Sequence, residues 1–236
     1  MFISIFDNFK TAALFGIIFI FLMTTLGAAL VFFFRKQISG NINRIFLGFA
    51  AGVMIAASIW SLLIPAIDSS EEQGIPGYLT AGIGFLAGGF FLLLVDHLLP
   101  HIHPQSNVQE GVKSRLKRPT MLILAVTLHN IPEGLAVGLS FGLAIQAQDL
   151  TLLPAALGLA IGIGLQNFPE GAAISLPLKN ENMSNQKAFL MGTLSGVVEP
   201  IAAVIGILLA SWLPVVMPWF LAFAAGAMIY VVAEEL

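Results

Sequence analysis

Two apolar segments set the architecture of this chain: PTMLILAVTLHNIPEGLAVGLSFGLAIQ at residues 119–146 and TLLPAALGLAIGIGLQNFPEGAAISLPL at residues 151–178. Each exceeds the roughly 20 residues that a helix needs to cross a bilayer. Each also carries one polar motif near its centre, HNIPEG at 129–134 and QNFPEG at 166–171. We therefore predict two adjacent, antiparallel spanning helices with matching polar motifs inside the membrane.

The spacing within each motif gathers its polar side chains on one side of the helix. Residues four apart share a face, so His129 lies beside Glu133 and Gln166 lies beside Glu170. The proline in each motif cannot donate to the carbonyl four residues earlier, which leaves that carbonyl free. A broken turn at membrane depth is tolerated only where it faces protein or a polar cavity. Both motifs are therefore expected to face the interior of a helix bundle.

The composition agrees with a polytopic membrane protein. Of 236 residues, 58% are hydrophobic and only 10% are charged, and the mean hydropathy is +0.93. Soluble domains usually contain about 25% charged residues. The chain has no cysteine, which excludes disulfides and thiolate metal sites. The first apolar run, 12–34, is too long for a cleavable signal peptide and predicts a first spanning helix.

The hydropathy pattern predicts an all-α bundle of seven transmembrane helices in a single domain, residues 1–236. Glycine, proline and charged residues mark the connections between the helices. The longest polar connection is the histidine-containing loop 100–118. The predicted spans are about 11–34, 44–67, 78–99, 119–146, 151–178, 187–211 and 215–235.

The basic residues predict the orientation. Nine of the ten lysines and arginines fall in the first, third and fifth loops, and only Lys10 falls on the other side. Because cytoplasmic loops are enriched in Lys and Arg, these loops are expected inside the cell and the N-terminus outside. The nine residues are Arg35, Lys36, Arg44, Lys113, Arg115, Lys117, Arg118, Lys179 and Lys187.

Few ionisable residues lie well inside the apolar spans: Glu133, Glu170, Glu199 and His129. An ionisable residue inside a membrane is costly, so it indicates a functional site. Carboxylate, imidazole and amide groups are ligands for divalent transition metals such as Zn²⁺, Fe²⁺ and Mn²⁺. The alternative is that these polar groups pair with one another and only hold helices together. The repetition of the motif favours the metal site.

The two motifs resemble the signature of the ZIP (Zrt-/Irt-like) family of divalent metal transporters, and the bacterial branch with a short loop after the third span is most similar. The resemblance covers nearly the whole chain. It implies a homodimer in the bacterial inner (cell) membrane that imports metal into the cytoplasm. Glycine pairs such as Gly84 and Gly88 would permit a dimer. The family has eight spans, whereas seven are visible in this sequence.

The resemblance also implies a binuclear metal site halfway across the membrane, with Glu170 shared by both positions. Many family members have histidine where this chain has Gln166, and some have aspartate where it has Asn167. Gln is a weaker, neutral ligand, and Asn removes a charge. The first position would comprise His129, Glu133, Gln166 and Glu170, and the second Asn130, Asn167, Glu170 and Glu199.

Residues outside the motifs are candidates for an entrance and an exit. The family resemblance implies an entrance along the second span at Met54, Ser61 and Asp68, which are seven residues apart. The alternative is that Met54 and Ser61 only pack against neighbouring helices. It also makes Glu235 a candidate ligand at the exit. A cluster at the cytoplasmic end of the third span could deliver metal or be a solvated loop, because histidine is the commonest metal ligand. Its members are Asp96, His97, His101 and His103.

The expected activity is transport by alternating access, with Zn²⁺ as the main substrate and Fe²⁺, Mn²⁺ and Cd²⁺ as further candidates. The sequence contains no P-loop, so ATP hydrolysis is not expected. A metal-selective channel is the first alternative, and an intramembrane metal hydrolase is the second. The chain lacks the HExxH motif of a metal hydrolase. Membrane lipids are expected partners, whereas an organic cofactor and nucleic acid are not.

Overall fold

The computed structural model describes residues 8–34, 40–100, 111–113, 118–180 and 183–235, and these residues contain helices and no strand. Within these described ranges, seven helical segments are long and apolar enough to cross a membrane, which confirms the predicted all-α fold with seven spans. These segments are Phe9–Phe32, Leu47–Glu72, Gly77–Leu98, Pro119–Ala147, Leu150–Lys179, Asn185–Trp212 and Pro214–Glu234.

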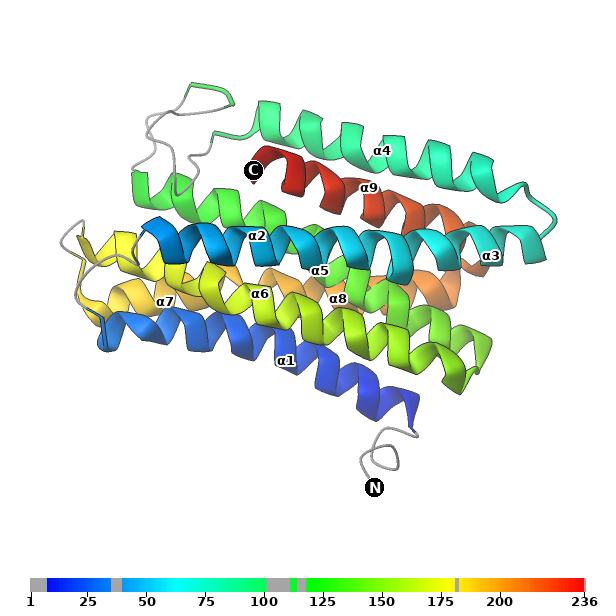
Figure 1. Ribbon diagram of the computed structural model, residues 1–236, viewed down its shortest axis with the longest axis horizontal. Helices are drawn as coiled ribbons and strands as arrows, with labels where there is room; N and C mark the ends of the chain where they lie inside the picture. Colours follow the sequence, from blue (N-terminus) through cyan, green and yellow to red (C-terminus); the bar gives the residue numbers. More distant parts are fainter. Residues whose placement is uncertain (1–7, 35–39, 101–110, 114–117, 181–182, 236) are drawn as a thin grey trace.

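Several spans contain more than one helical element: a π-helix joins two α-helices in the second span, a turn separates two α-helices in the sixth, and 3₁₀ turns extend the ends of three other spans. Figure 1 shows the longer elements running roughly parallel to one another along the bundle. In chain order the elements are α1 (Phe9–Ala29), η2 (Leu30–Phe32), α2 (Gly40–Ala56), η3 (Ala57–Leu63), α3 (Ile64–Glu72), α4 (Gly77–Leu98), α5 (Arg118–Ala147), η4 (Leu150–Leu152), α6 (Leu153–Asn180), α7 (Asn185–Ser195), α8 (Val198–Trp212), η5 (Pro214–Val216) and α9 (Met217–Glu235).

Helix α5, which carries the first motif, lies in the core of the bundle. Of its most apolar stretch, 67% of the residues are buried, compared with 22% for α4 at the upper edge of Figure 1. Helix α4 exposes Tyr78, Leu86 and Phe90. Because a spanning helix at the edge of a bundle contacts hydrocarbon, this surface is apolar. The first motif therefore lies on the most buried of these spanning helices.

Glycines hold α4 and α9 in direct backbone contact. A Cβ atom placed on Gly88 would lie 1.9 Å from the carbonyl oxygen of Phe223, and one placed on Gly226 would lie 1.9 Å from that of Phe85. Small residues of this kind let membrane helices approach closely. Because Gly84 and Gly88 both pack against α9 within the chain, these two glycines do not support the dimer that their spacing suggested.

The glycine that ends each motif is also a close contact between helices. A Cβ atom on Gly134 would lie 2.3 Å from the carbonyl oxygen of Glu199 in α8, and one on Gly171 would lie 2.1 Å from that of Thr24 in α1. Helices α5 and α8 therefore pack as one close pair, and helices α1 and α6 as another. These two contacts bring Glu199 and Thr24 next to the motifs.

Two spans contain backbone irregularities that the sequence analysis did not predict. The second span contains the π-helix η3, in which Ser58 Oγ donates to the Met54 carbonyl at 2.8 Å. The sixth span is interrupted between α7 and α8, where the Glu199 N–H bonds to the Gly196 carbonyl at 3.1 Å. π-Turns and helix breaks of this kind often occur at functional sites.

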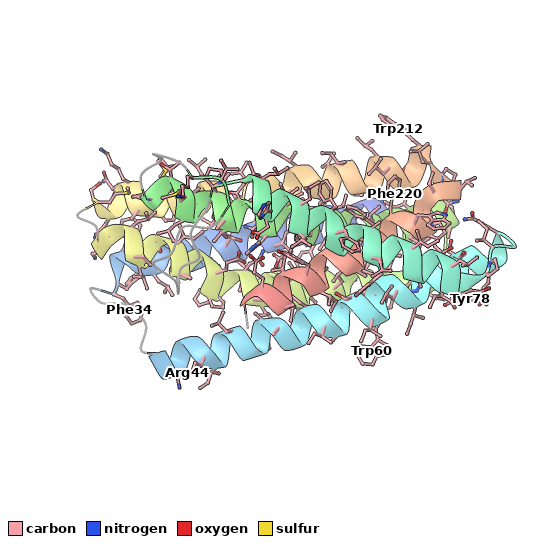
Figure 2. The ribbon with its side chains drawn as sticks, turned by 90° about the horizontal axis from the view of Figure 1, so that it is seen from above. Phe34, Arg44, Trp60, Tyr78, Trp212 and Phe220 are labelled. Atoms are coloured by element: carbon pink, nitrogen blue, oxygen red, sulfur yellow. The ribbon has the colours of Figure 1, made fainter. Side chains whose placement is uncertain are left out.

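The ends of the bundle carry the polar and aromatic residues expected near membrane surfaces. Tyr78 and Trp212 lie at helix ends, project outward (Figure 2) and are 74% and 72% exposed. Such aromatic side chains are enriched at membrane–water interfaces. In the turn before α6, Asp149 accepts hydrogen bonds from the Thr151 hydroxyl and N–H, both at 2.8 Å, and these bonds lower the pKa of Asp149.

Candidate functional site

The two motifs meet in the interior, where α5 and α6 lie side by side. Glu133 is 2% exposed and Gln166 is 3% exposed. The Gln166 side-chain amide donates a hydrogen bond to Glu133 Oε1. The His129 side chain, one turn before Glu133, is also buried. The structure therefore brings together three of the four residues expected at the first metal position.

Glu199 of α8 is the centre of a second buried group. Its carboxylate is fully buried and accepts hydrogen bonds from residues on three other helices. Asn130 Nδ2 of α5 donates to Oε1 at 2.9 Å, Asn167 Nδ2 of α6 donates to Oε2 at 2.8 Å, and Thr24 Oγ1 of α1 donates to Oε1 at 2.9 Å. Charge-assisted hydrogen bonds of this kind are the stronger ones in proteins.

The break between α7 and α8 explains how Glu199 reaches this position. Because the Glu199 N–H bonds to Gly196, it does not bond to the Ser195 carbonyl as it would in a continuous α-helix. Asn130 Nδ2 donates to that Ser195 carbonyl at 3.3 Å. Glu199 then lies in the first turn of α8, where the helix dipole favours a negative charge. The first motif thus stabilises the break as well as the carboxylate.

Three amide oxygens in these groups have no hydrogen-bond partner among the described residues. They are Oδ1 of Asn130, Oε1 of Gln166 and Oδ1 of Asn167, and all three are buried. In each amide the nitrogen donates to a glutamate, which fixes the oxygen as the unpaired atom. A buried polar atom without a partner is costly. Amide oxygens can coordinate a divalent cation, as neutral ligands that are weaker than carboxylate or imidazole.

Two further residues lie beside these buried groups: Glu170 lies near Glu199, and His129 lies near Glu234 of α9. Glu170 is half-buried and lies close enough to Glu199 for their like charges to repel. His129 Nε2 lies 3.8 Å from Glu234 Oε2, near the end of α9. A cation between Glu170 and Glu199 would relieve their repulsion, since opposite charges stabilise each other most strongly where water is excluded.

The acids and histidines alone do not form a compact metal site. Within the described ranges, no three His, Asp or Glu side chains are grouped so as to hold a metal ion. The carboxylates are instead divided between two groups, one containing Glu133 and the other Glu199, and each group includes amides. A metal ion in this arrangement would therefore need amide oxygens among its ligands.

The residues expected at the entrance lie along the second span. Met54 is 4% exposed, Ser61 is half-buried within the π-helix η3, and Asp68 is exposed near the end of α3. Of these three residues, Met54 is therefore the most buried and Asp68 the most exposed. The π-turn changes the register between Met54 and Ser61, so their spacing of seven residues does not place them on one face as it would in a regular α-helix.

The residues expected at the exit are described only in part. Asp96 is half-buried and accepts a hydrogen bond from the Tyr230 hydroxyl at 3.4 Å. His97 is exposed at the end of α4. His101 and His103 lie outside the described residues, as does the Glu235 side chain.

Sequence reasoning missed two members of the site, Thr24 and Glu234. Thr24 looks like an ordinary residue of an apolar span, because threonine often bonds to its own helix, and Thr24 Oγ1 does lie 3.3 Å from the Ile20 carbonyl. Only the three-dimensional packing of α1 on α6 brings it to Glu199. Glu234 is an acid near the end of the last span, next to the candidate ligand Glu235, and the sequence pattern does not distinguish between these two neighbours.

Thr24 is expected to stabilise the position of Glu199. In Thr24→Val, one charge-assisted hydrogen bond to a buried carboxylate is lost, so the free energy of unfolding should fall by roughly 1.5–3 kcal/mol. Thermal unfolding in detergent measures this change. Thr25→Val is the matched control, because Thr25 Oγ1 is buried without a hydrogen-bond partner among the described residues. Equal unfolding temperatures for the two variants would show that Thr24 does not support Glu199.

A family model and individual known proteins match nearly the full length of this chain. A family model described as ZIP Zinc transporter matches residues 8–120 and 109–236. The zinc transporter ZIP11 of Homo sapiens is 36% identical, with 95% of this chain and 88% of that protein covered. The zinc transporter ZIPB of Bordetella bronchiseptica is 36% identical (91% and 68% covered), and the zinc transporter ZupT of Chlorobaculum parvum is 33% identical (94% and 87% covered). This chain belongs to the ZIP zinc transporter family.

Proposed function

We propose that this integral membrane protein carries divalent transition-metal cations, Zn²⁺ above all, into the cytoplasm by alternating access. The observation that carries the proposal is the set of three buried amide oxygens without partners beside buried glutamates. A structure held together only by polar pairing would be expected to satisfy these atoms, because each unpaired buried group costs free energy. Bound cations would satisfy them, one at the position of Gln166 and one at the position of Asn130 and Asn167. The family and its relatives are transporters rather than enzymes, so the hydrolase alternative is set aside.

The proposed site has two metal positions. His129, Glu133, Gln166 and Glu170 hold the first, and Asn130, Asn167, Glu170 and Glu199 hold the second. Gln166 and both asparagines supply neutral oxygens, so the charge of each position comes from its glutamates. The supporting contacts are the hydrogen bonds from Gln166 to Glu133 and from both asparagines to Glu199.

The proposed pathway crosses the bundle from the second span to the ends of α4 and α9. Metal enters past Asp68 and Ser61, with Met54 deeper in the span, and leaves near Asp96 and His97. The cytoplasmic segment with His101 and His103, together with Glu235, completes the exit. The cytoplasmic assignment rests on the basic residues, of which Arg44, Lys179 and Lys187 belong to helix ends at one end of the bundle and Lys10 to the other (Figure 1).

The broken helices suggest which parts move. Pro132 and Pro169 lie inside α5 and α6, where each removes one backbone hydrogen bond, and a turn interrupts the span that carries Glu199. Transporters commonly bind substrate at the membrane midplane between discontinuous helices that move against their neighbours. Because metal ligands must be deprotonated, metal binding would also release protons, and this couples uptake to pH. The protein is further proposed to act as a homodimer in a bacterial inner membrane.

Metal uptake into proteoliposomes tests the proposal. Vesicles containing the protein should take up Zn²⁺ at a rate that saturates with concentration and rises steeply with temperature, and Fe²⁺, Mn²⁺ and Cd²⁺ in parallel rank the substrates. Protein-free vesicles are the control. Flux that does not saturate and changes little with temperature would favour a metal-selective channel. Flux equal to that of protein-free vesicles would reject transport altogether.

A further inference from the structure

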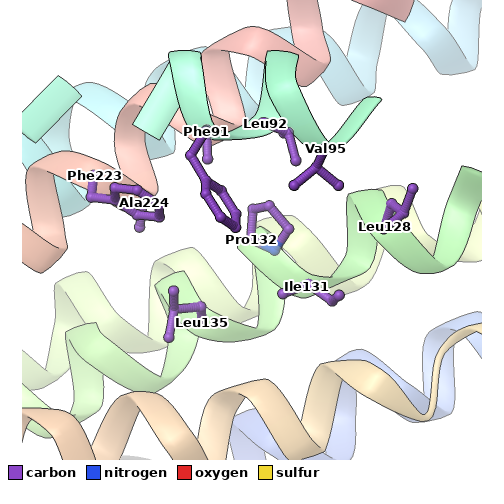
Figure 3. Close-up of a pocket in the computed structure, with 10 residues that line it drawn as sticks. Phe91, Leu92, Val95, Leu128, Ile131, Pro132, Leu135, Phe223 and Ala224 are labelled. Atoms are coloured by element: carbon purple, nitrogen blue, oxygen red, sulfur yellow. The ribbon is translucent and has the colours of Figure 1, made fainter. Parts of the chain in front are cut away.

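An apolar pocket lies beside the first motif, away from the polar site. It has a volume of about 400 Å³ and is lined entirely by apolar side chains from α4, α5 and α9. Figure 3 shows Phe91 and Leu92 of α4 on one side and Ile131 and Pro132 of α5 on the other, with the Phe91 ring extending toward Pro132. Ligand pockets in proteins typically measure about 300–1,000 Å³, so this one is large enough for a ligand.

The pocket lies between two closely packed helix pairs. Glycine contacts join α4 to α9 on one side, and other glycine contacts join α5 to α8 on the other. No glycine on α5 makes such a contact with α4 or α9 among the described residues. The space between the two pairs is therefore not closed by direct backbone contact, which explains why a cavity remains at this place and not within either pair.

The exposed residues at the edge of the pocket indicate which kind of molecule can enter it. Phe91 is 51% exposed and Ile131 is 41% exposed, and both belong to spanning segments, well inside their ends. At this depth the surrounding medium is hydrocarbon and not water. Water would not fill the pocket, because an apolar cavity offers it no hydrogen-bond partners. A flexible, unbranched hydrocarbon chain matches both the lining and the medium.

We propose that the pocket binds the acyl chain of a bilayer phospholipid, which inserts between α4 and α5 and contacts Pro132. Because the chain comes from hydrocarbon, the favourable term is the dispersion contact that it makes with pocket walls that would otherwise lack partner atoms. Pro132 lies between Asn130 and Glu133 in the sequence, so the bound chain contacts helix α5 where its hydrogen bonding is interrupted. The site is separate from the polar residues of the proposed metal site and does not depend on metal transport.

Photolabelling of the purified protein in detergent tests the proposal. The probe is a phosphatidylglycerol with a diazirine on one acyl chain, titrated against the protein, with labelled peptides identified by mass spectrometry. Labelling at Phe91, Ile131 and Phe223 should saturate, whereas labelling at Leu86 and Phe90 on the exposed face of α4 should rise in proportion to the probe. Proportional labelling at both places would show ordinary contact with surrounding lipid and would overturn the proposal.

Two further arms complete the test. A free fatty acid with the same diazirine distinguishes the source of the chain, since saturable labelling by the fatty acid alone would exclude a phospholipid. Ala224→Phe places a ring in the pocket and should remove the saturable labelling, whereas Ala87→Phe, on an exposed position of α4, should keep it. Saturable labelling that persists in a folded Ala224→Phe variant would locate the chain elsewhere. If Ala224→Phe does not fold, the wild-type titration decides alone.

Discussion

Proteoliposomes containing the Glu133→Ala, Glu170→Ala double variant are expected to take up no more Zn²⁺ than protein-free vesicles. Glu133 belongs to the first proposed metal position, and Glu170 is shared by both. Without them, the first position keeps only the neutral ligands His129 and Gln166, and the second keeps one carboxylate, Glu199. Carboxylates supply the negative charge that compensates for the dehydration of a divalent cation. Their removal should therefore abolish transport.

The double variant should still fold, which makes its loss of uptake interpretable. Glu133→Ala leaves the Gln166 amide without its acceptor, at a cost of about 1–3 kcal/mol. Glu170→Ala relieves the repulsion on Glu199 and offsets part of that cost. Size-exclusion chromatography and thermal unfolding check the fold, and Glu72→Ala, at an exposed acid at the end of α3, is the matched control. Normal uptake by the folded double variant would show that the motifs serve only helix packing.

The fold class was predictable from the sequence because its signal is strong and local. Each span is a long apolar run, and no water is available inside a bilayer to satisfy a chain that is not helical. The seven helical spans follow from this rule alone. The π-turn at Ala57–Leu63 and the break before Val198 did not follow from it. Both depend on contacts with other helices, which a hydropathy pattern does not record.

The candidate site was predictable only where a residue is unusual in its surroundings. Glu133 and Glu199 are conspicuous because acids are rare in apolar segments. Thr24 is not conspicuous, because threonine is common in spanning helices and can bond to its own backbone. The role of the motif glycines could not be predicted either, because glycine is common in these spans. Gly134 and Gly171 look like two glycines among many, and only the approach of α8 and α1 gives them their function.

Glu199→Leu is expected to be among the most destabilising single substitutions in this chain. It leaves the Nδ2 group of Asn167 without an acceptor, and it removes the charged acceptor of Asn130 and Thr24. A loss of roughly 3 kcal/mol follows from the cost of buried donors without partners, which corresponds to a fall of roughly 6–12 °C in unfolding temperature for a chain of this size. Thermal unfolding in detergent, without added metal, measures the effect.

Glu199→Gln separates the structural role of this residue from its charge. The Gln side-chain oxygen can replace Oε1 and keep the hydrogen bonds from Thr24 and Asn130. The Gln nitrogen would then face Asn167, whose amide can turn and offer Oδ1, an atom that has no other hydrogen-bond partner among the described residues. We therefore expect an unfolding temperature close to that of the wild type but weaker Zn²⁺ binding by isothermal titration calorimetry, because the second position loses a charge. Wild-type Zn²⁺ affinity in Glu199→Gln would mean that Glu199 supports the fold and does not bind the metal.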